Sequence, residues 1–244
     1  MARLPLEGVK VLDVSTMIAA PFGAVLLGDF GADVIKVELP GKGDTLRHVG
    51  PFKDGEPLRW PGLARNKRSL TLDLRKEEGM NIFKELVRHV DIVIENFRPG
   101  TLEKWGGGYE ELKRINPKLV MIRVSGYGQT GPFREKAGFG TPATAFSGFT
   151  YLQGYPDRPP VSPILSIKDI FEHPHYQARE NIIEVAHPRL SKIKMPGIVP
   201  KFEKTPGAIR RTAPDLGEHT EEILQTMLGM SKEDIERLRE NEII

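Results

Sequence analysis

Short apolar segments alternate with helix-like segments along the first half of the chain. Between the apolar segments, residues 76–89 carry apolar side chains at helical spacing, and residues 21–30 and 109–115 have the pattern of short helices. The apolar segments have the length and β-rich composition of buried strands, and they cover residues 9–14, 33–38, 69–74, 91–95 and 119–124. Strands separated by helices indicate right-handed βαβ units. The pattern therefore predicts an α/β fold, with a Rossmann-like parallel sheet flanked by helices.

The second half of the chain is rich in proline and has shorter periodic segments. Ten prolines fall between Pro156 and Pro214. The pattern predicts a helix over 166–179 capped by Ser166, a hairpin that pairs 182–185 with 192–194, and two terminal helices over 220–228 and 232–239. We therefore expect a large domain over 1–160, a truncated remnant of a smaller α+β domain over 161–205, and a linker with two returning helices over 206–244.

Two long connections, 39–68 and 125–134, leave the carboxyl ends of predicted strands. Open α/β sheets bind ligands at these ends, and loops of this length are uncommon without a function. A dinucleotide site would need paired glycines directly after the first strand, whereas residues 15–21 read Ser-Thr-Met-Ile-Ala-Ala-Pro. The sequence therefore favours a ligand site at this edge, but not an NAD site.

Composition narrows the function classes further. The chain has no cysteine, which excludes disulfides and cysteine-ligated metals, and its six histidines form no metal-ligand pattern, so we expect no metal. No stretch approaches the ~18 apolar residues of a membrane span, and no signal peptide is visible, so we expect a cytoplasmic protein without membrane contact. A net charge of +2 makes no general case for nucleic acid. A basic stretch over 189–211 precedes an acidic tail, and these two segments either bind a polyanion or neutralise each other.

The segment Asn96-Phe97-Arg98 directly follows a predicted buried strand. Asn96 offers an amide donor and acceptor, Phe97 a stacking face, and Arg98 a planar fork that suits phosphate. On its own the segment is equally consistent with an ordinary strand-to-helix turn.

Several ordered blocks carry a resemblance to a known family. In the first half they are residues 6–13, 19–21, 27–38, 66–74, 95–100 and 125–132, and downstream they are 169–175, 185–188, 205–207 and 213–220. This series resembles the class III coenzyme A transferases, the family of formyl-CoA transferase, carnitine–CoA transferase and α-methylacyl-CoA racemase. The first series runs to about Val161, where the chain continues with a stretch that normally lies far downstream, so a long middle segment of the family pattern is missing.

The resemblance implies a Rossmann-like domain with a small domain in an interlocked homodimer. It implies acyl-CoA and a carboxylic acid as substrates, and no tightly bound cofactor. In these transferases an aspartate attacks the thioester, which gives a mixed anhydride and then an enzyme–CoA thioester. Asp169 has the spacing of this nucleophile from Pro159 and Pro160, yet it also matches a downstream block in which the acid only begins a helix.

The resemblance also assigns a coenzyme A site. The CoA-binding residues that it implies are Thr16, Met17, Ile18, Ala19, Leu72, Arg75, Asn96, Phe97, Arg98, Lys104, Lys136, Phe139 and Gly140. Residues 16–20 would lie along the pantetheine, and residues 72–75 and 96–98 would hold the adenosine and phosphates. The racemases carry a His-Asp pair after the glycine-rich loop, whereas this chain has Gly138-Phe139-Gly140-Thr141, so racemase activity is disfavoured. A non-catalytic CoA-binding or scaffold homologue without the nucleophile is the alternative to a CoA-transferase.

Overall fold

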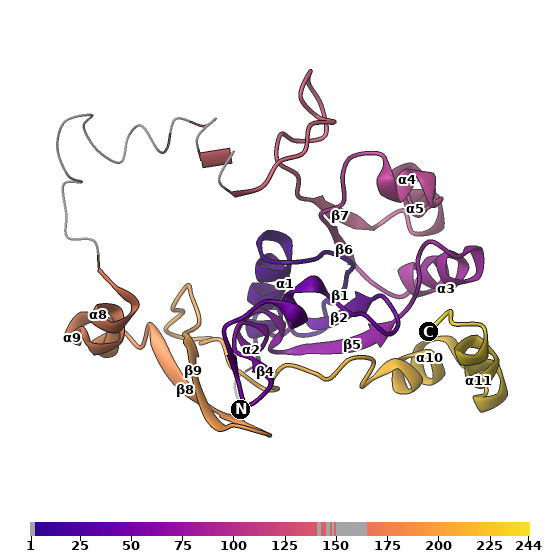
Figure 1. Ribbon diagram of the computed structural model, residues 1–244. Helices are drawn as coiled ribbons and strands as arrows, with labels where there is room; N and C mark the ends of the chain where they lie inside the picture. The colour runs from indigo at the N-terminus through magenta and orange to yellow at the C-terminus, as the bar shows by residue number, and fades with distance from the viewer. Residues whose placement is uncertain (1–2, 141–142, 145–146, 148, 150–164) are drawn as a thin grey trace.

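A computed structural model describes residues 3–140, 143–144, 147, 149 and 165–244. Five strands form a parallel sheet in the order β5-β2-β1-β6-β7 (Figure 1). They are β1 (Lys10–Asp13), β2 (Asp33–Glu38), β5 (Lys67–Thr71), β6 (Ile92–Glu95) and β7 (Val120–Arg123). The predicted α/β fold is confirmed. The strand order reverses between β1 and β6, and the crevice at such a switch point is where open α/β sheets bind ligands.

Helices cover both faces of the sheet. On one face, α1 (Ala19–Asp29) packs Ala20 and Ala24 against the central strands. The other face carries α3 (Glu77–Val87), α5 (Tyr109–Ile115), α10 (Thr220–Leu228) and α11 (Lys232–Glu240) over the largest apolar core. A short helix, α4 (Thr101–Lys104), precedes α5. Figure 1 shows that α10 and α11 return beside α3, so the end of the chain completes the core that its first half begins.

The long connection after β2 contains small elements of its own. They are η1 (Thr45–His48), β3 (Phe52–Lys53), β4 (Glu56–Pro57) and α2 (Trp60–Ala64). In the second half, β8 (Ile182–His187) and β9 (Ser191–Pro196) pair as an antiparallel hairpin, which confirms the predicted hairpin with longer strands. None of the helices in the described part of the chain is long and apolar enough to cross a membrane.

The predicted single helix over 166–179 is wrong. The chain forms α8 (Ile167–Glu172) and α9 (Pro174–Ala178), and extended backbone at His173 separates them. Proline disfavours the helical conformation in the residue before it, which explains the break. Ser166 caps α8 as expected. The predicted domain boundary at residue 160 lies outside the described residues.

One predicted strand is also displaced toward its amino end. The sequence pattern favours a strand over 69–74, but β5 ends at Thr71. Leu72 still donates its amide to the Glu38 carbonyl, whereas the Asp73 amide donates to the Ile243 carbonyl at 2.8 Å. Beyond the end of β5, the backbone of this segment thus bonds to Ile243 and no longer to β2.

A buried ion pair joins the sheet layer to the returning chain. Arg65 donates to both carboxylate oxygens of Asp29, with a shortest distance of 2.7 Å, and both residues are buried. Arg65 also donates to the Pro196 carbonyl at 2.9 Å. Asn66 donates to Asp29 at 2.8 Å and accepts from the Arg210 amide at 2.7 Å. One carboxylate therefore ties α1 and the α2–β5 turn, and through them β9 and the 206–211 segment, into a single structure.

Replacing this acid should destabilise the whole chain. We expect Asp29→Asn to lower the free energy of unfolding by about 3–5 kcal/mol, because Arg65 would keep its buried charge without a counterion. The matched control is Asp33→Asn, since Asp33 pairs with Arg68 but is 43% exposed, and it should cost about 1 kcal/mol or less. Urea unfolding measures both, and equal losses would contradict this account.

Candidate functional site

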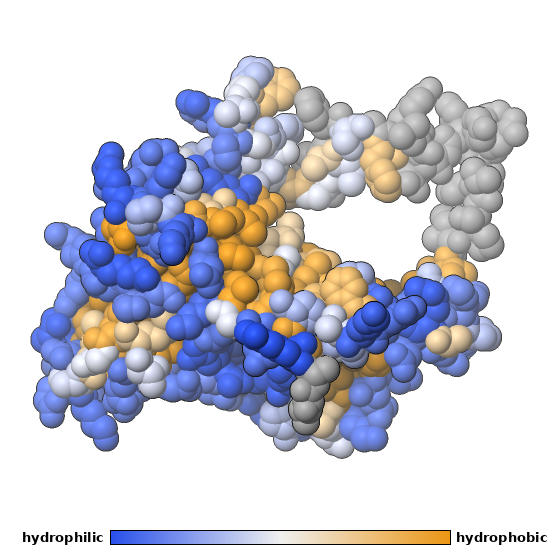
Figure 2. All heavy atoms as spheres, turned by 180° about the vertical axis from the view of Figure 1, so that it is seen from behind, coloured by the Kyte–Doolittle hydropathy of each residue, from blue (hydrophilic) through white to orange (hydrophobic). Residues whose placement is uncertain are grey.

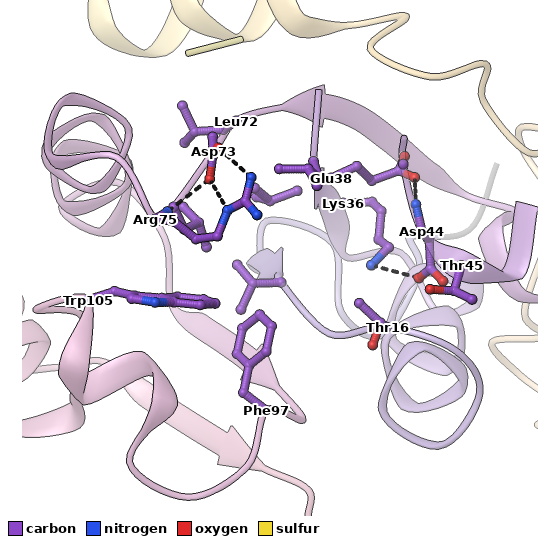
Figure 3. Close-up of a pocket in the computed structure, with 15 residues that line it drawn as sticks. Thr16, Lys36, Glu38, Asp44, Thr45, Leu72, Asp73, Arg75, Phe97 and Trp105 are labelled. Carbon is purple, nitrogen blue, oxygen red and sulfur yellow. Dashed lines mark hydrogen bonds and ion pairs between the residues drawn. The ribbon is translucent and has the colours of Figure 1, made fainter. Parts of the chain in front are cut away.

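A pocket of about 250 Å³ opens where β1, β2, β5 and β6 end (Figure 3). Its walls come from the loops that leave these strands, and Trp105 reaches it from the end of α4. The residues that line this aromatic pocket are Val14, Thr16, Lys36, Val37, Glu38, Leu39, Gly43, Asp44, Thr45, Leu72, Asp73, Leu74, Arg75, Phe97 and Trp105. The pocket is thus at the edge of the sheet where the sequence predicts a ligand.

One end of the aromatic pocket is apolar and flat. Phe97 and Trp105 meet edge to face, with ring centroids 5.2 Å apart. Figure 3 shows these two rings facing Leu72 and Arg75 across the opening. Flat aromatic walls of this kind suit a planar heterocycle, because stacking adds to the burial of apolar area.

Arg75 places a positive charge at the mouth of the pocket. Its side chain is 57% exposed, and it donates to the two oxygens of Asp73 at 2.8 and 2.7 Å. The hydrogen bond from Arg75 holds the pKa of Asp73 below its ordinary value, so Asp73 remains a carboxylate. The guanidinium is thereby oriented, and its exposed edge is available to an anionic group.

The opposite end of the pocket rests on buried charges. Lys36 lies 3.2 Å from Asp44 and donates to the Ser15 carbonyl, and Lys67 donates to Asp13 at 2.7 Å. Burial raises the pKa of Asp13. The attraction of Lys36 and Lys67 and the hydrogen bonds from Lys67 and Ser15 lower this pKa by more, so the net shift is downward. The group is therefore ionised and internally paired.

A second buried acid fixes the loop that closes this end. Glu38 accepts two hydrogen bonds from Arg47, both 2.8 Å long, and one from Ser69 at 2.8 Å. The guanidinium of Arg47 in turn lies over the Trp60 ring, 3.9 Å from its centroid. Since Glu38 also accepts from the Asp44 amide at 2.9 Å, the whole turn over 44–48 is held against the sheet.

Asn96 holds the loop that follows β1. Its side chain accepts from the Thr16 amide and donates to the Thr16 carbonyl, each at 2.8 Å. The Met17 amide donates to Asp44 at 3.1 Å, and Met17 has a positive φ of 68°. The side chains of Met17 and Ile18 remain 37% and 47% exposed. The backbone of this loop is thus fixed while its apolar side chains face outward.

The structure brings some of the predicted CoA-binding residues together. Thr16, Leu72, Arg75 and Phe97 line one pocket, and Asn96 positions Thr16. The other predicted residues do not line it. Of these, Met17, Ile18 and Ala19 continue the loop into α1, Arg98 and Lys104 are exposed beside it, and Lys136, Phe139 and Gly140 are exposed in the segment after β7. Their roles stay predictions.

Asp169 lies in the first turn of α8, outside the aromatic pocket. Figure 1 shows α8 beside the β8–β9 hairpin. The carboxylate is fully exposed and accepts from the Ser166 amide and hydroxyl at 2.7 and 2.6 Å. The hydrogen bonds from Ser166 lower the pKa of Asp169. In this structure the side chain caps a helix, and its role as a nucleophile stays a prediction.

Sequence reasoning missed several residues that shape the pocket. No local sequence pattern indicates that Trp105 lines the pocket, because its place there depends on how α4 packs against Phe97. Lys36 and Glu38 did have one, because charged side chains inside a strand buried on both faces demand partners. Asp44 follows from the same argument once the turn after β2 is placed.

Removing the Asn96 side chain should loosen the loop after β1. We expect Asn96→Ala to speed hydrogen exchange at the Thr16 amide about fivefold, because the amide loses its acceptor and the carbonyl its donor. Asn116→Ala is the matched control, because the Asn116 side chain likewise bonds to backbone groups, the Val87 and Val90 carbonyls, but lies far from this loop in the sequence. Unchanged exchange at Thr16 in Asn96→Ala would contradict the role assigned to Asn96.

Glu38 should make stability depend on pH. Burial raises its pKa, but Arg47, Lys36 and the Asp44 amide lower it, and the net pKa lies below the ordinary 4.5. A carboxylate with a lowered pKa stabilises the fold above its unfolded pKa, and this contribution is lost as the pH falls. We expect Glu38→Gln to cost about 3–5 kcal/mol at neutral pH, with the difference from the unsubstituted chain narrowing below pH 4.5. Urea unfolding across this range tests it, and a constant difference would be the contrary result.

Comparison with known proteins identifies the family. A family model described as CoA-transferase family III matches residues 6–163 and 160–220. These matches overlap at 160–163, where the sequence predicts that two separate family segments meet.

Among the described residues, no group of three or more potential ligands is placed to hold a metal ion.

Curated relatives are similar over about two thirds of the chain. Succinyl-CoA–D-citramalate CoA-transferase of Chloroflexus aurantiacus is 57% identical over 166 residues, 68% of this chain and 41% of that protein. The succinyl-CoA–L-malate CoA-transferase beta subunit of the same organism is 56% identical over 66% of this chain and 40% of that protein. Human succinyl-CoA:glutarate CoA-transferase is 41% identical over 68% of this chain and 38% of that protein. The matched part of the chain thus spans about two fifths of the length of these relatives.

Solved structures share the fold. A CAIB/BAIF family protein from Brucella suis superposes with a TM-score of 0.81 at 22% identity, covering 93% of this chain and 100% of that one. The hypothetical protein Rv3272 from Mycobacterium tuberculosis gives a TM-score of 0.77 at 18% identity, covering 91% and 99%. Because the family model matches most of the chain, over ranges that include every residue lining the aromatic pocket, the chain belongs to CoA-transferase family III.

Proposed function

We propose that this chain binds an acyl-CoA at the aromatic pocket and transfers coenzyme A between that thioester and a small carboxylic acid. The observation that carries the proposal is that every residue lining the pocket falls within the matched residues 6–163. The pocket chemistry agrees with this ligand, since an apolar aromatic slot lies next to an oriented guanidinium. A heterocycle that bears phosphates needs both.

The polarity of the pocket suggests how the ligand lies. We assign the adenine ring to the slot between Phe97, Trp105 and Leu72, with Arg75 nearest to the phosphates. The pantetheine arm then runs past Thr16 toward the loop over 17–19, where Met17 and Ile18 offer exposed apolar contacts. Asn96 acts through Thr16, as a positioning residue.

The relatives suggest the donor to test first. Three of them carry names in which succinyl-CoA is the CoA donor, so succinyl-CoA is our proposed substrate. The homodimer and the cytoplasmic location expected from the sequence remain part of the proposal. Light scattering tests the dimer, and a monomer mass would count against it.

The proposed chemistry is a sequence of acyl transfers through an enzyme carboxylate. The carboxylate attacks the thioester carbonyl, and the C–S bond breaks. CoA departs as its thiolate, and a mixed anhydride of the enzyme carboxylate and the donor acid remains. The thiolate then attacks the enzyme's acyl carbon and expels the donor acid as its carboxylate. The acceptor carboxylate attacks the resulting enzyme–CoA thioester, and the released thiolate finally attacks the acceptor's carbonyl, which frees the enzyme carboxylate. Asp169 is the candidate for this carboxylate.

A specific observation favours a second candidate function. Asp169 is exposed, engaged with Ser166 and outside the aromatic pocket. A chain with this arrangement would bind coenzyme A without performing the transfer. Hydroxylamine distinguishes the two functions: with succinyl-CoA it should trap a hydroxamate on Asp169 if transfer occurs, and no hydroxamate if the chain only binds.

Binding should depend on the aromatic wall. We expect Phe97→Ala to weaken coenzyme A binding about tenfold in titration calorimetry, since stacking on a base is worth about 1–3 kcal/mol. Phe52→Ala is the matched control, because Phe52 is 51% exposed and does not line the pocket. Absence of coenzyme A binding by the unsubstituted chain would overturn both candidate functions.

A further inference from the structure

The two aromatic residues of the slot are only partly buried. Phe97 lies in the turn after β6, and Trp105 directly follows α4, a helix of four residues. A helix this short is not stable by itself, so its orientation depends on contacts with the rest of the chain. Each aromatic residue also follows an acid by two positions, Glu95 in the first case and Glu103 in the second. These two acids are the next residues to consider.

One arginine from the edge strand contacts both acids. Arg123, the last residue of β7, lies opposite Glu95 in the sheet and donates from Nε to its carboxylate at 2.8 Å. Its Nη2 atom lies 2.7 Å from the carboxylate of Glu103, in α4. Only 19% of the Arg123 side chain is exposed, and none of the three residues lines the aromatic pocket. Arg123 thus joins α4 to the end of β6 from outside the pocket.

Glu95 connects this arginine to Phe97. The Glu95 side chain is buried, and its second oxygen accepts from the Phe97 amide at 2.6 Å. Burial raises the pKa of Glu95, whereas hydrogen bonds from Arg123 and from the Phe97 amide lower it, and the net shift is upward. Without Arg123 this pKa would rise further, and a protonated carboxyl group is a weaker acceptor for the Phe97 amide. The position of Phe97 therefore depends on Arg123.

Glu103 connects the same arginine to Trp105. The Glu103 carbonyl accepts from the Gly106 amide at 2.9 Å, so Trp105 lies within a tight turn that begins at Glu103. On its other side the turn is fixed to the core, because the Gly107 amide donates to the carbonyl of the buried Leu102 at 2.9 Å. The ion pair on Glu103 thus restrains the turn that carries the indole ring.

We propose that Arg123 is a positioning residue for the aromatic slot, an inference that rests on the proposed function. Because one guanidinium holds both Glu95 and Glu103, it fixes the edge-to-face arrangement of Phe97 and Trp105 before the adenine enters. Ordering the two rings on binding would otherwise reduce the affinity for the ligand. The role requires a planar group that meets two carboxylates along two edges, which the point charge of a lysine cannot do.

Titration calorimetry of the full chain with coenzyme A tests the inference. We expect Arg123→Gln to weaken binding about fivefold, and Arg123→Lys to weaken it by the same factor although the charge is kept. Glu103→Gln should weaken binding about twofold. The direction of this last effect is diagnostic, because removing a negative charge would by itself strengthen the binding of an anionic ligand.

A double-mutant cycle separates positioning from a general loss of stability. In the Phe97→Ala background, Arg123→Gln should weaken coenzyme A binding by at most about twofold more, since one of the two rings that it positions is gone. Arg114→Gln is the matched control and should leave binding unchanged. Arg114 lies in α5, in the connection that leads to β7, but it is 72% exposed, pairs with Glu111 at 2.6 Å and does not line the pocket.

Several results would overturn the role of Arg123 and leave the proposed function intact. They are unchanged affinity in Arg123→Gln or Glu103→Gln, tighter binding by Glu103→Gln, full recovery in Arg123→Lys, and a full fivefold further loss in the Phe97→Ala background. If the Arg123 variants do not fold, Glu103→Gln decides the question, because its side chain is 40% exposed and its replacement costs little stability. Failure of the unsubstituted chain to bind coenzyme A would instead refute the proposed function.

Discussion

The edge of the sheet where the aromatic pocket opens depends on charges buried beneath it. Lys36 and Glu38 lie inside a strand that is covered on both faces, where an unpaired charge would cost several kcal/mol. Asp44 and Arg47 provide the partners, and both belong to the turn after β2. The turn therefore has to lie against the sheet for the strand to be stable. One side of the aromatic pocket is built by this requirement.

The same principle organises the rest of the chain. Asn66, which donates to Asp29, also donates to the Ala208 carbonyl and so binds the segment over 206–211 to α1. Near the other end of the sheet, the Ile243 carbonyl accepts from the Asp73 amide. Segments far apart in the sequence thus complete one core and one edge. Figure 2 shows that hydrophobic side chains also gather on one face of the molecule.

The sequence predicts those features that local patterns determine. Apolar runs located all five strands of the sheet, and Ser166 marks a helix start through its capping hydrogen bonds. Features that depend on long-range contacts were not predictable in this way. Trp105 lines the pocket because α4 packs there, and β5 ends early because the chain terminus competes for its backbone. The break at His173 did have a local signal, in Pro174, which outweighed the helical pattern.

Tryptophan fluorescence tests directly whether the aromatic slot receives the adenine of coenzyme A, as we propose. The chain has two tryptophans, Trp105 in the slot and Trp60 beneath Arg47, outside the pocket lining. In a Trp60→Phe variant, which retains Trp105 alone, the account predicts saturable quenching by coenzyme A. A Trp105→Phe variant that binds coenzyme A should show no such quenching. Bound coenzyme A that leaves the emission of Trp105 unchanged would contradict the account.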